Sequence, residues 1–132
     1  MDITLSDKTY KIYMGLDFIR YLDAQQEAKL DFGISFSTGV AQLMADIEQG
    51  SPLGLVHFIQ AGTCTEPKSE RPTEKEIEEG ILKSKPEEVQ KLFLSLKEAL
   101  QTSPMTAQML QGYQNIMDQL VQQIVQGVAA KS

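Results

Sequence analysis

The chain has 132 residues, of which 42% are hydrophobic and 23% are charged, as in ordinary globular proteins. Its formal net charge of −6 argues against a protein that binds nucleic acid or an anionic membrane surface, because both partners attract basic faces. No apolar run approaches the ~20 residues of a membrane-spanning helix, and residues 1–8 lack the basic and apolar regions of a signal peptide. We therefore expect one soluble, cytoplasmic domain over residues 1–132.

Residues 2–14 alternate between apolar and polar side chains on either side of Ser6-Asp7-Lys8, which predicts a β-hairpin. The alternating apolar residues are Ile3, Leu5, Tyr10, Ile12 and Met14. An isolated hairpin is only marginally stable in water, so this one needs a surface to lie on. We expect that surface to be the apolar stretch over residues 36–65.

A helix is predicted over residues 16–29, after Gly15 ends the hairpin. Its predicted inner stripe is Leu16, Ile19 and Leu22, with Phe18 and Tyr21 beside it. Residues 30–35 show no period, and we expect a loop there that is anchored by Phe32 and Ile34.

Residues 36–65 are the most apolar part of the chain and predict two short helices joined at Gly50. Ser37 is the expected cap of the first helix, and Ser51 and Pro52 suit the N-cap and first position of the second. The predicted inner faces are Val40, Leu43, Met44 and Ile47, then Leu53, Val56, Phe58 and Ile59. The second helix has no Arg, Lys or Asn to reach base edges, which argues against a DNA-binding helix-turn-helix. This helical pair is the predicted core.

A capping box predicts the next helix start, with Thr73 at the N-cap and Glu76 three positions later. The predicted inner face of this helix is Ile77, Ile81 and Leu82. Many glutamates fall in residues 70–88, but at the spacing of a solvated helix face and without the ligand pattern of a calcium loop. Pro86 begins a further helix, whose predicted inner face is Val89, Leu92, Phe93, Leu96 and Leu100.

The last predicted helix, over residues 105–128, has a wide apolar stripe and an outer face of Gln and Asn. Only Asp118 and Lys131 carry side-chain charges in this part of the chain. A long helix with so little charge is typical of an interface, with either the core or another subunit. The predicted fold is therefore mostly α: a compact helical domain with a small N-terminal β-hairpin over residues 1–103, and a long C-terminal helix over residues 104–132.

The chain contains one cysteine, Cys64, and one histidine, His57. They cannot form an internal disulfide or a structural zinc site, which usually takes four Cys or His ligands. Seven positions separate them, or ~10 Å along a helix, which is too far for a Cys–His dyad. We expect both to be packing or surface residues. Because the sequence also lacks phosphate-binding glycine motifs, we expect a non-enzymatic protein without cofactor or metal.

Several stretches, taken in order, resemble the small tail assembly chaperones of long-tailed phages and prophages of the Gram-positive type. The stretches are residues 10–15 and 17–23, residues 50–56 and 59–63, residues 71–78, and residues 91–93 with Ser103-Pro104. The resemblance covers roughly residues 2–104, and the final helix lies outside it.

The resemblance implies a non-enzymatic protein that coats the tape-measure protein during tail assembly, helps to recruit tail-tube protein, and is absent from the finished virion. It provides no catalytic residues. Many such chaperones are made in two lengths by a programmed frameshift. The alternative function is a structural helical adaptor or oligomerisation protein that stays in its phage or bacterial complex.

We expect the partner-binding residues to lie on the apolar stripe of the last helix. This expected contact stripe comprises Met109, Tyr113, Met117, Leu120 and Ile124. Its partner would be either the client protein or a second copy of the chain, because an assembly chaperone needs an exposed apolar face and charge elsewhere.

Overall fold

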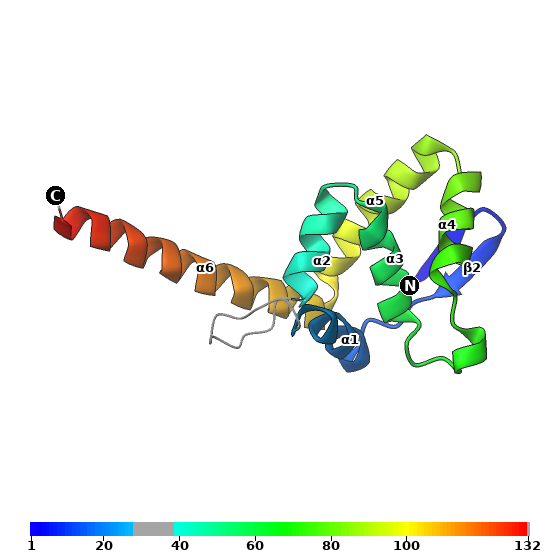
Figure 1. Cartoon of the computed structure of the whole chain (residues 1–132), viewed down its shortest axis with the longest axis horizontal. Coiled ribbons are helices and arrows are strands. Elements are labelled where there is room, and N and C mark those ends of the chain that lie inside the picture. The colour runs from blue at the N-terminus through cyan, green and yellow to red at the C-terminus, as the bar shows by residue number, and fades with distance from the viewer. Residues whose placement is uncertain (28–38, 132) are drawn as a thin grey trace.

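The computed structural model describes residues 1–27 and 39–131 of the chain (Figure 1). Its elements are β1 (Asp2–Leu5), β2 (Lys8–Lys11), α1 (Leu16–Glu27), α2 (Gly39–Glu48), α3 (Pro52–Gly62), the 3-10 helix η1 (Lys68–Glu70), α4 (Glu74–Lys83), α5 (Pro86–Thr102) and α6 (Pro104–Lys131). The mostly α fold with a small hairpin and a long C-terminal helix is thus confirmed. The predicted loop at residues 30–35 and the predicted cap Ser37 lie outside the described residues.

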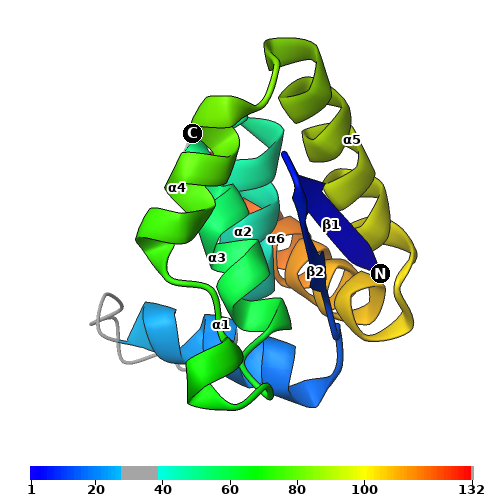
Figure 2. The same ribbon diagram turned by 90° about the vertical axis from the view of Figure 1, so that its right-hand side faces the viewer.

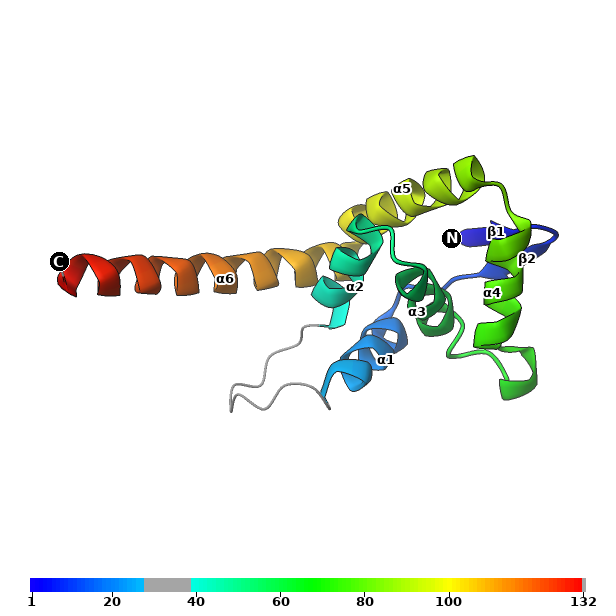
Figure 3. The ribbon, with the colours of Figure 1, turned by 45° about the horizontal axis from the view of Figure 1, so that its top comes forward.

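The hairpin and the five helices α1–α5 form a compact body, and α6 projects from it (Figures 1 and 3). In Figure 2 the hairpin faces the viewer, at the end of the body opposite to the direction in which α6 runs. The central element of the body is α2, which contacts α1, α3, α5 and α6. The most apolar stretch of the chain therefore lies at the centre of the fold.

The hairpin is held by a tight turn and by its contact with the helices. β1 and β2 pair antiparallel with Leu5 opposite Lys8, and Ser6 has a positive φ of 58° at the first turn position, as in a type II′ turn. Beyond β2, the Tyr13 amide donates to the Gly62 carbonyl oxygen at 2.9 Å. A Cβ atom at Gly62 would collide with Ile12, so this end of α3 must be glycine. The hairpin also packs on α4, so the helical pair is only part of its floor.

Helix boundaries follow the local signals in the sequence. Gly50, with a φ of +71°, follows α2, and Pro52 is the first residue of α3 with Ser51 at its N-cap. The Thr73 hydroxyl oxygen accepts a hydrogen bond of 3.1 Å from the Glu76 amide at the start of α4. Each of these boundaries was predicted from the sequence.

The buried face of α1 is rotated from its predicted position. Phe18 and Leu22 are buried, Ile19 is partly buried against the core, and Leu16 is exposed. The rings of Phe18 and Phe58 meet edge to face, with centroids 5.3 Å apart. This aromatic contact between α1 and α3 directs Phe18 inward, and Leu16 lies about 160° away around the helix.

Two further leucines that were predicted to face inward are exposed. Leu53 is 59% exposed and Leu82 is 76% exposed. Successive helix residues differ by about 100°, so Leu53 lies about 160° from the buried Leu55. By the same geometry Leu82 lies about 140° from the buried Ile77. The remaining predicted inner-face residues of these helices are buried or partly buried.

The contact between α1 and α2 depends on Gly39. A Cβ atom there would lie 2.5 Å from the Leu22 carbonyl carbon and 2.6 Å from the Asp23 amide nitrogen. Backbone atoms cannot move aside as a side chain can. We therefore expect Gly39→Ala to destabilise the fold by about 1–3 kcal/mol, measured as a lower midpoint of urea unfolding.

Gly112 in α6 is the matched control, because a Cβ atom at that position would meet nothing within 4 Å. We expect Gly112→Ala to leave stability unchanged or to raise it by up to about 1 kcal/mol, since alanine favours helix. Equal midpoints for Gly39→Ala and the wild type would contradict the close packing of α1 on α2.

Candidate interaction surface

The base of α6 is fixed firmly to the body. Thr106 is fully buried, and its hydroxyl donates a 2.8 Å hydrogen bond to the Leu100 carbonyl oxygen. The Ala107 amide donates to the Ser103 carbonyl oxygen at 2.8 Å and starts the helix directly after α5. Met109 and Leu110 pack against the core. The direction of α6 is therefore set by buried contacts with α5 and α2.

The outer part of α6, residues 116–131, leaves the body, and no described element runs beside it (Figures 1 and 3). Five of the apolar side chains in residues 116–125 are open to solvent, from 37% exposed at Ile116 to 66% at Ile124, and Met117 is half-buried. We call these apolar residues the outer stripe: Ile116, Met117, Leu120, Val121, Ile124 and Val125.

The outer stripe covers one side of the helix. Its members form three adjacent pairs that repeat every four positions, which places them on a continuous face about half the circumference wide. The opposite side of the helix is polar, and its side chains form hydrogen bonds with one another. The Gln114 side-chain amide donates to the Asp118 carboxylate at 2.8 Å, and the Gln111 side-chain amide donates to the Asn115 side-chain oxygen at 3.1 Å. A face this wide and apolar is typical of a helix that another helix covers.

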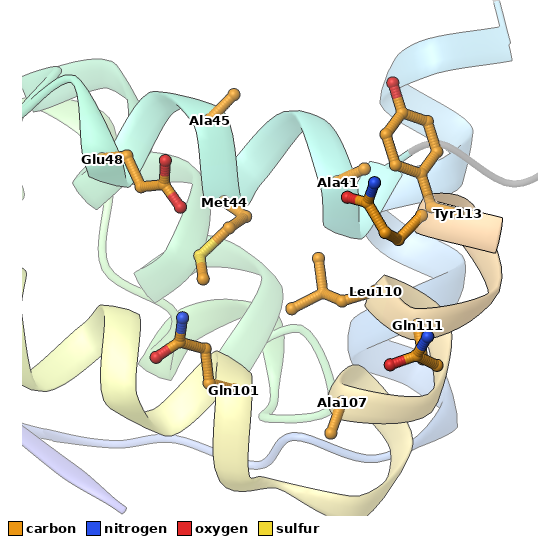
Figure 4. A pocket seen from close by; sticks show the side chains of 10 residues that line it. Ala41, Met44, Ala45, Glu48, Gln101, Ala107, Leu110, Gln111 and Tyr113 are labelled. Atoms are coloured by element: carbon orange, nitrogen blue, oxygen red, sulfur yellow. The ribbon is translucent and has the colours of Figure 1, made fainter. Parts of the chain in front are cut away.

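A groove of about 410 Å³ lies at the base of this face, between α2, α5 and α6 (Figure 4). In the figure the side chains of Met44 and Leu110 point into it, with Tyr113 at one end and Glu48 and Gln101 at the other. Among the described residues that line the groove, only Glu48 is charged. Like the outer stripe, the groove is largely uncharged. Tyr113 lies where the groove meets the outer part of α6.

The five residues of the expected contact stripe do not share one environment. Met109 packs against the core, and Tyr113 lines the groove. Met117 is half-buried, whereas Leu120 and Ile124 are exposed. The candidate surface thus begins further along α6 than the sequence pattern indicated, since the first residue of the pattern contributes to the body.

The contribution of α2 to the groove was missed by the sequence analysis. Ala41, Met44 and Ala45 line the groove from α2, and Gln101 lines it from α5. Met44 was predicted as a core residue, which its burial confirms, and nothing in its local sequence indicates a second surface. Only the packing of α2 across α6 creates this groove.

Cys64 is not set up as a nucleophile. Its thiol donates to the Asp17 carbonyl oxygen at 3.6 Å, and it lies in a small hollow with Tyr21 and Arg71. Burial raises the pKa of the Cys64 thiol, and the nearby Asp17 carboxylate raises this pKa further. A raised thiol pKa lowers the fraction of reactive thiolate.

His57 lies in a different hollow from Cys64. The His57 hollow is small and also lined by Asp46 and Gln42, and both His57 and Cys64 are half-buried. The structure therefore does not bring the two residues together as a catalytic pair.

Carboxylates of α4 and α5 are mostly exposed, as expected for a solvated face; Glu74, Glu78, Glu79, Glu87 and Glu88 belong to this group. Within residues 1–27 and 39–131, no three His, Cys, Asp or Glu side chains are grouped so that they could hold a metal ion. Over the same part of the chain, none of the helices combines the length and apolar character needed to cross a membrane.

A comparison with protein families gives one match that covers most of the chain. The family model described as phage tail assembly chaperone protein, TAC, matches residues 2–115. The match ends where α6 leaves the body, so it includes the groove and leaves the whole outer stripe outside it. No curated protein and no solved structure matches the chain. The chain belongs to the phage tail assembly chaperone family.

Proposed function

We propose that this chaperone is non-enzymatic, binds the tape-measure protein through the outer stripe and the adjoining groove, and helps to recruit tail-tube protein in the cytoplasm of the host cell. The observation that carries the proposal is the contrast along α6: its base is buried in the body, while residues 116–127 expose an apolar face. A face held out in this way is accessible to a client that has to be covered.

The dimensions of the surface support a helical client segment. Residues 116–131 span about 24 Å at 1.5 Å per residue, and the groove extends the apolar surface inward to Leu110 and Met44. An amphipathic helix that lies along such a surface would bury its own apolar stripe, as in other helix-in-groove complexes. The tape-measure protein, as the resemblance describes it, is a long protein that needs such cover during assembly.

The charge distribution fits the same role. The chain carries a net charge of −6, yet α6 has only Asp118 and Lys131 as charged residues. Exposed carboxylates on α4 and α5 keep the complex soluble, and the uncharged outer stripe avoids the cost of desolvating charges when a client binds.

A second candidate is a structural adaptor that remains in the assembled particle through the same surface. The outer stripe favours neither release nor retention. Finished tails distinguish the two functions: an assembly chaperone is absent from purified tails, whereas an adaptor is present in them.

We expect the double substitution Met117→Asp with Leu120→Asp to weaken binding to the tape-measure protein by tenfold or more. The reason is that two unpaired carboxylates would have to be buried in an apolar interface. The measurement is co-expression with the tape-measure protein and pull-down, followed by titration of the purified partners.

The matched control is Gln119→Asp with Gln122→Asp, which adds the same charge to the polar side of the same helix segment. This control should bind within about twofold of the wild type, because its carboxylates stay in water. Circular dichroism should show intact folds for both double variants. Wild-type affinity in the variant with Met117→Asp and Leu120→Asp would rule out the outer stripe as the client site.

We also expect His57→Gln with Cys64→Ser to leave tape-measure binding within about twofold of the wild type. Both residues lie in hollows of the body, away from α6, and the introduced serine hydroxyl can replace the thiol donor. A large loss of binding in a well-folded double variant would show that the body, rather than α6, contains the functional site.

A further inference from the structure

The groove between α2, α5 and α6 combines an apolar lining with one charged end. In Figure 4 the carboxylate of Glu48 and the side-chain amide of Gln101 lie at the end away from Tyr113. Three of the apolar lining residues are alanines, whose short side chains leave room for a large side chain of a partner. The apolar lining residues are Ala41, Met44, Ala45, Ala107 and Leu110.

Glu48 gives its end of the groove a negative charge that the described part of the chain does not neutralise. Its side chain is exposed, and no basic side chain within residues 1–27 and 39–131 forms an ion pair with it. Glu48 is also the last residue of α2, where the helix dipole is negative, and the last turn of α2 contains no basic residue. A carboxylate in this position attracts a cation from a partner.

We propose that the groove selects a client helix that carries a large apolar side chain and, one helical turn away, a lysine or arginine. The apolar side chain packs on Met44 and Leu110, and the basic side chain pairs with Glu48. This inference rests on the proposed function, since it specifies which segment of the tape-measure protein enters the groove.

The required spacing follows from α2 itself. Met44 and Glu48 are four positions apart, or about 6 Å along the helix axis. A client helix that lies along α2 has the same rise per residue, so its basic residue falls three or four positions from its apolar anchor, on the same face. The basic residue follows the anchor when the client runs parallel to α2, and it precedes the anchor when the client runs antiparallel.

The ion pair with Glu48 contributes more to selectivity than to affinity. Glu48 is exposed, and water and salt weaken an ion pair at such a position. A client segment with a carboxylate in place of the cation would instead be repelled by Glu48, and this repulsion separates suitable from unsuitable segments.

Charge reversal at Glu48 tests the proposal, by titration of the purified chaperone with the tape-measure protein. We expect Glu48→Gln to weaken binding about threefold and to make the affinity less sensitive to added salt. Glu48→Lys should weaken binding about tenfold or more, because attraction becomes repulsion. A lysine at the end of α2 suits the helix dipole, so this variant should have at least the wild-type midpoint of urea unfolding.

Glu79→Lys is the matched control, because it makes the same change in net charge at an exposed position of α4, a helix that does not line the groove. It should bind within about twofold of the wild type. An equal loss of affinity in Glu79→Lys and Glu48→Lys would show a general charge effect and overturn the proposal.

A reciprocal exchange identifies the basic residue of the client. Each lysine or arginine in the tape-measure segment that the chaperone protects from hydrogen exchange is changed in turn to glutamate. One of these changes should weaken binding to the wild-type chaperone and restore binding to Glu48→Lys, as expected for two side chains in contact. If none of them restores binding, the proposed ion pair does not exist.

The outcomes separate this inference from the proposed function. Suppose that Met117→Asp with Leu120→Asp abolishes binding, while Glu48→Lys keeps the wild-type affinity and salt dependence. The outer stripe would then be the client site, and selection by the groove would be refuted. A wild-type chaperone that does not bind the tape-measure protein at all would overturn both.

Discussion

The buried junction of α2, α5 and the base of α6 is the contact on which the rest of the structure depends. Thr106, with its hydrogen bond to the Leu100 carbonyl oxygen, and the packed side chain of Leu110 fix the start of α6. Because buried contacts hold this start, the remaining helix leaves the body in one direction (Figure 1), and its apolar face is exposed. A looser junction would let the outer stripe fold back onto the body.

Local signals in the sequence were sufficient to predict most of the secondary-structure elements and their boundaries. Gly50, Pro52 and Thr73 mark helix boundaries through backbone conformation or a single hydrogen bond, and these effects depend on neighbours in the chain. The direction of a side chain around its helix was harder to predict, as Leu53 and Leu82 show. Which face of an apolar helix is covered depends on the partner helix, and periodicity alone does not contain that information.

The candidate surface was also predictable only where it depends on local sequence and not on contacts between distant elements. Sequence reasoning located α6 and its apolar stripe but could not tell that Met109 belongs to the body while Leu120 is exposed. The groove beside Met44 was not predictable, since it exists only where α2 crosses α6.

Hydrogen exchange with mass spectrometry, on the full chain with and without the tape-measure protein, tests the central claim most directly. In dilute protein without client we expect fast exchange of the backbone amides of residues 116–127 and slow exchange in α2 and α3, because only the latter are buried. Client binding should slow exchange in residues 116–127 and leave the hairpin and α4 unchanged. Protection that appears in the hairpin or α4, with none in α6, would contradict the account.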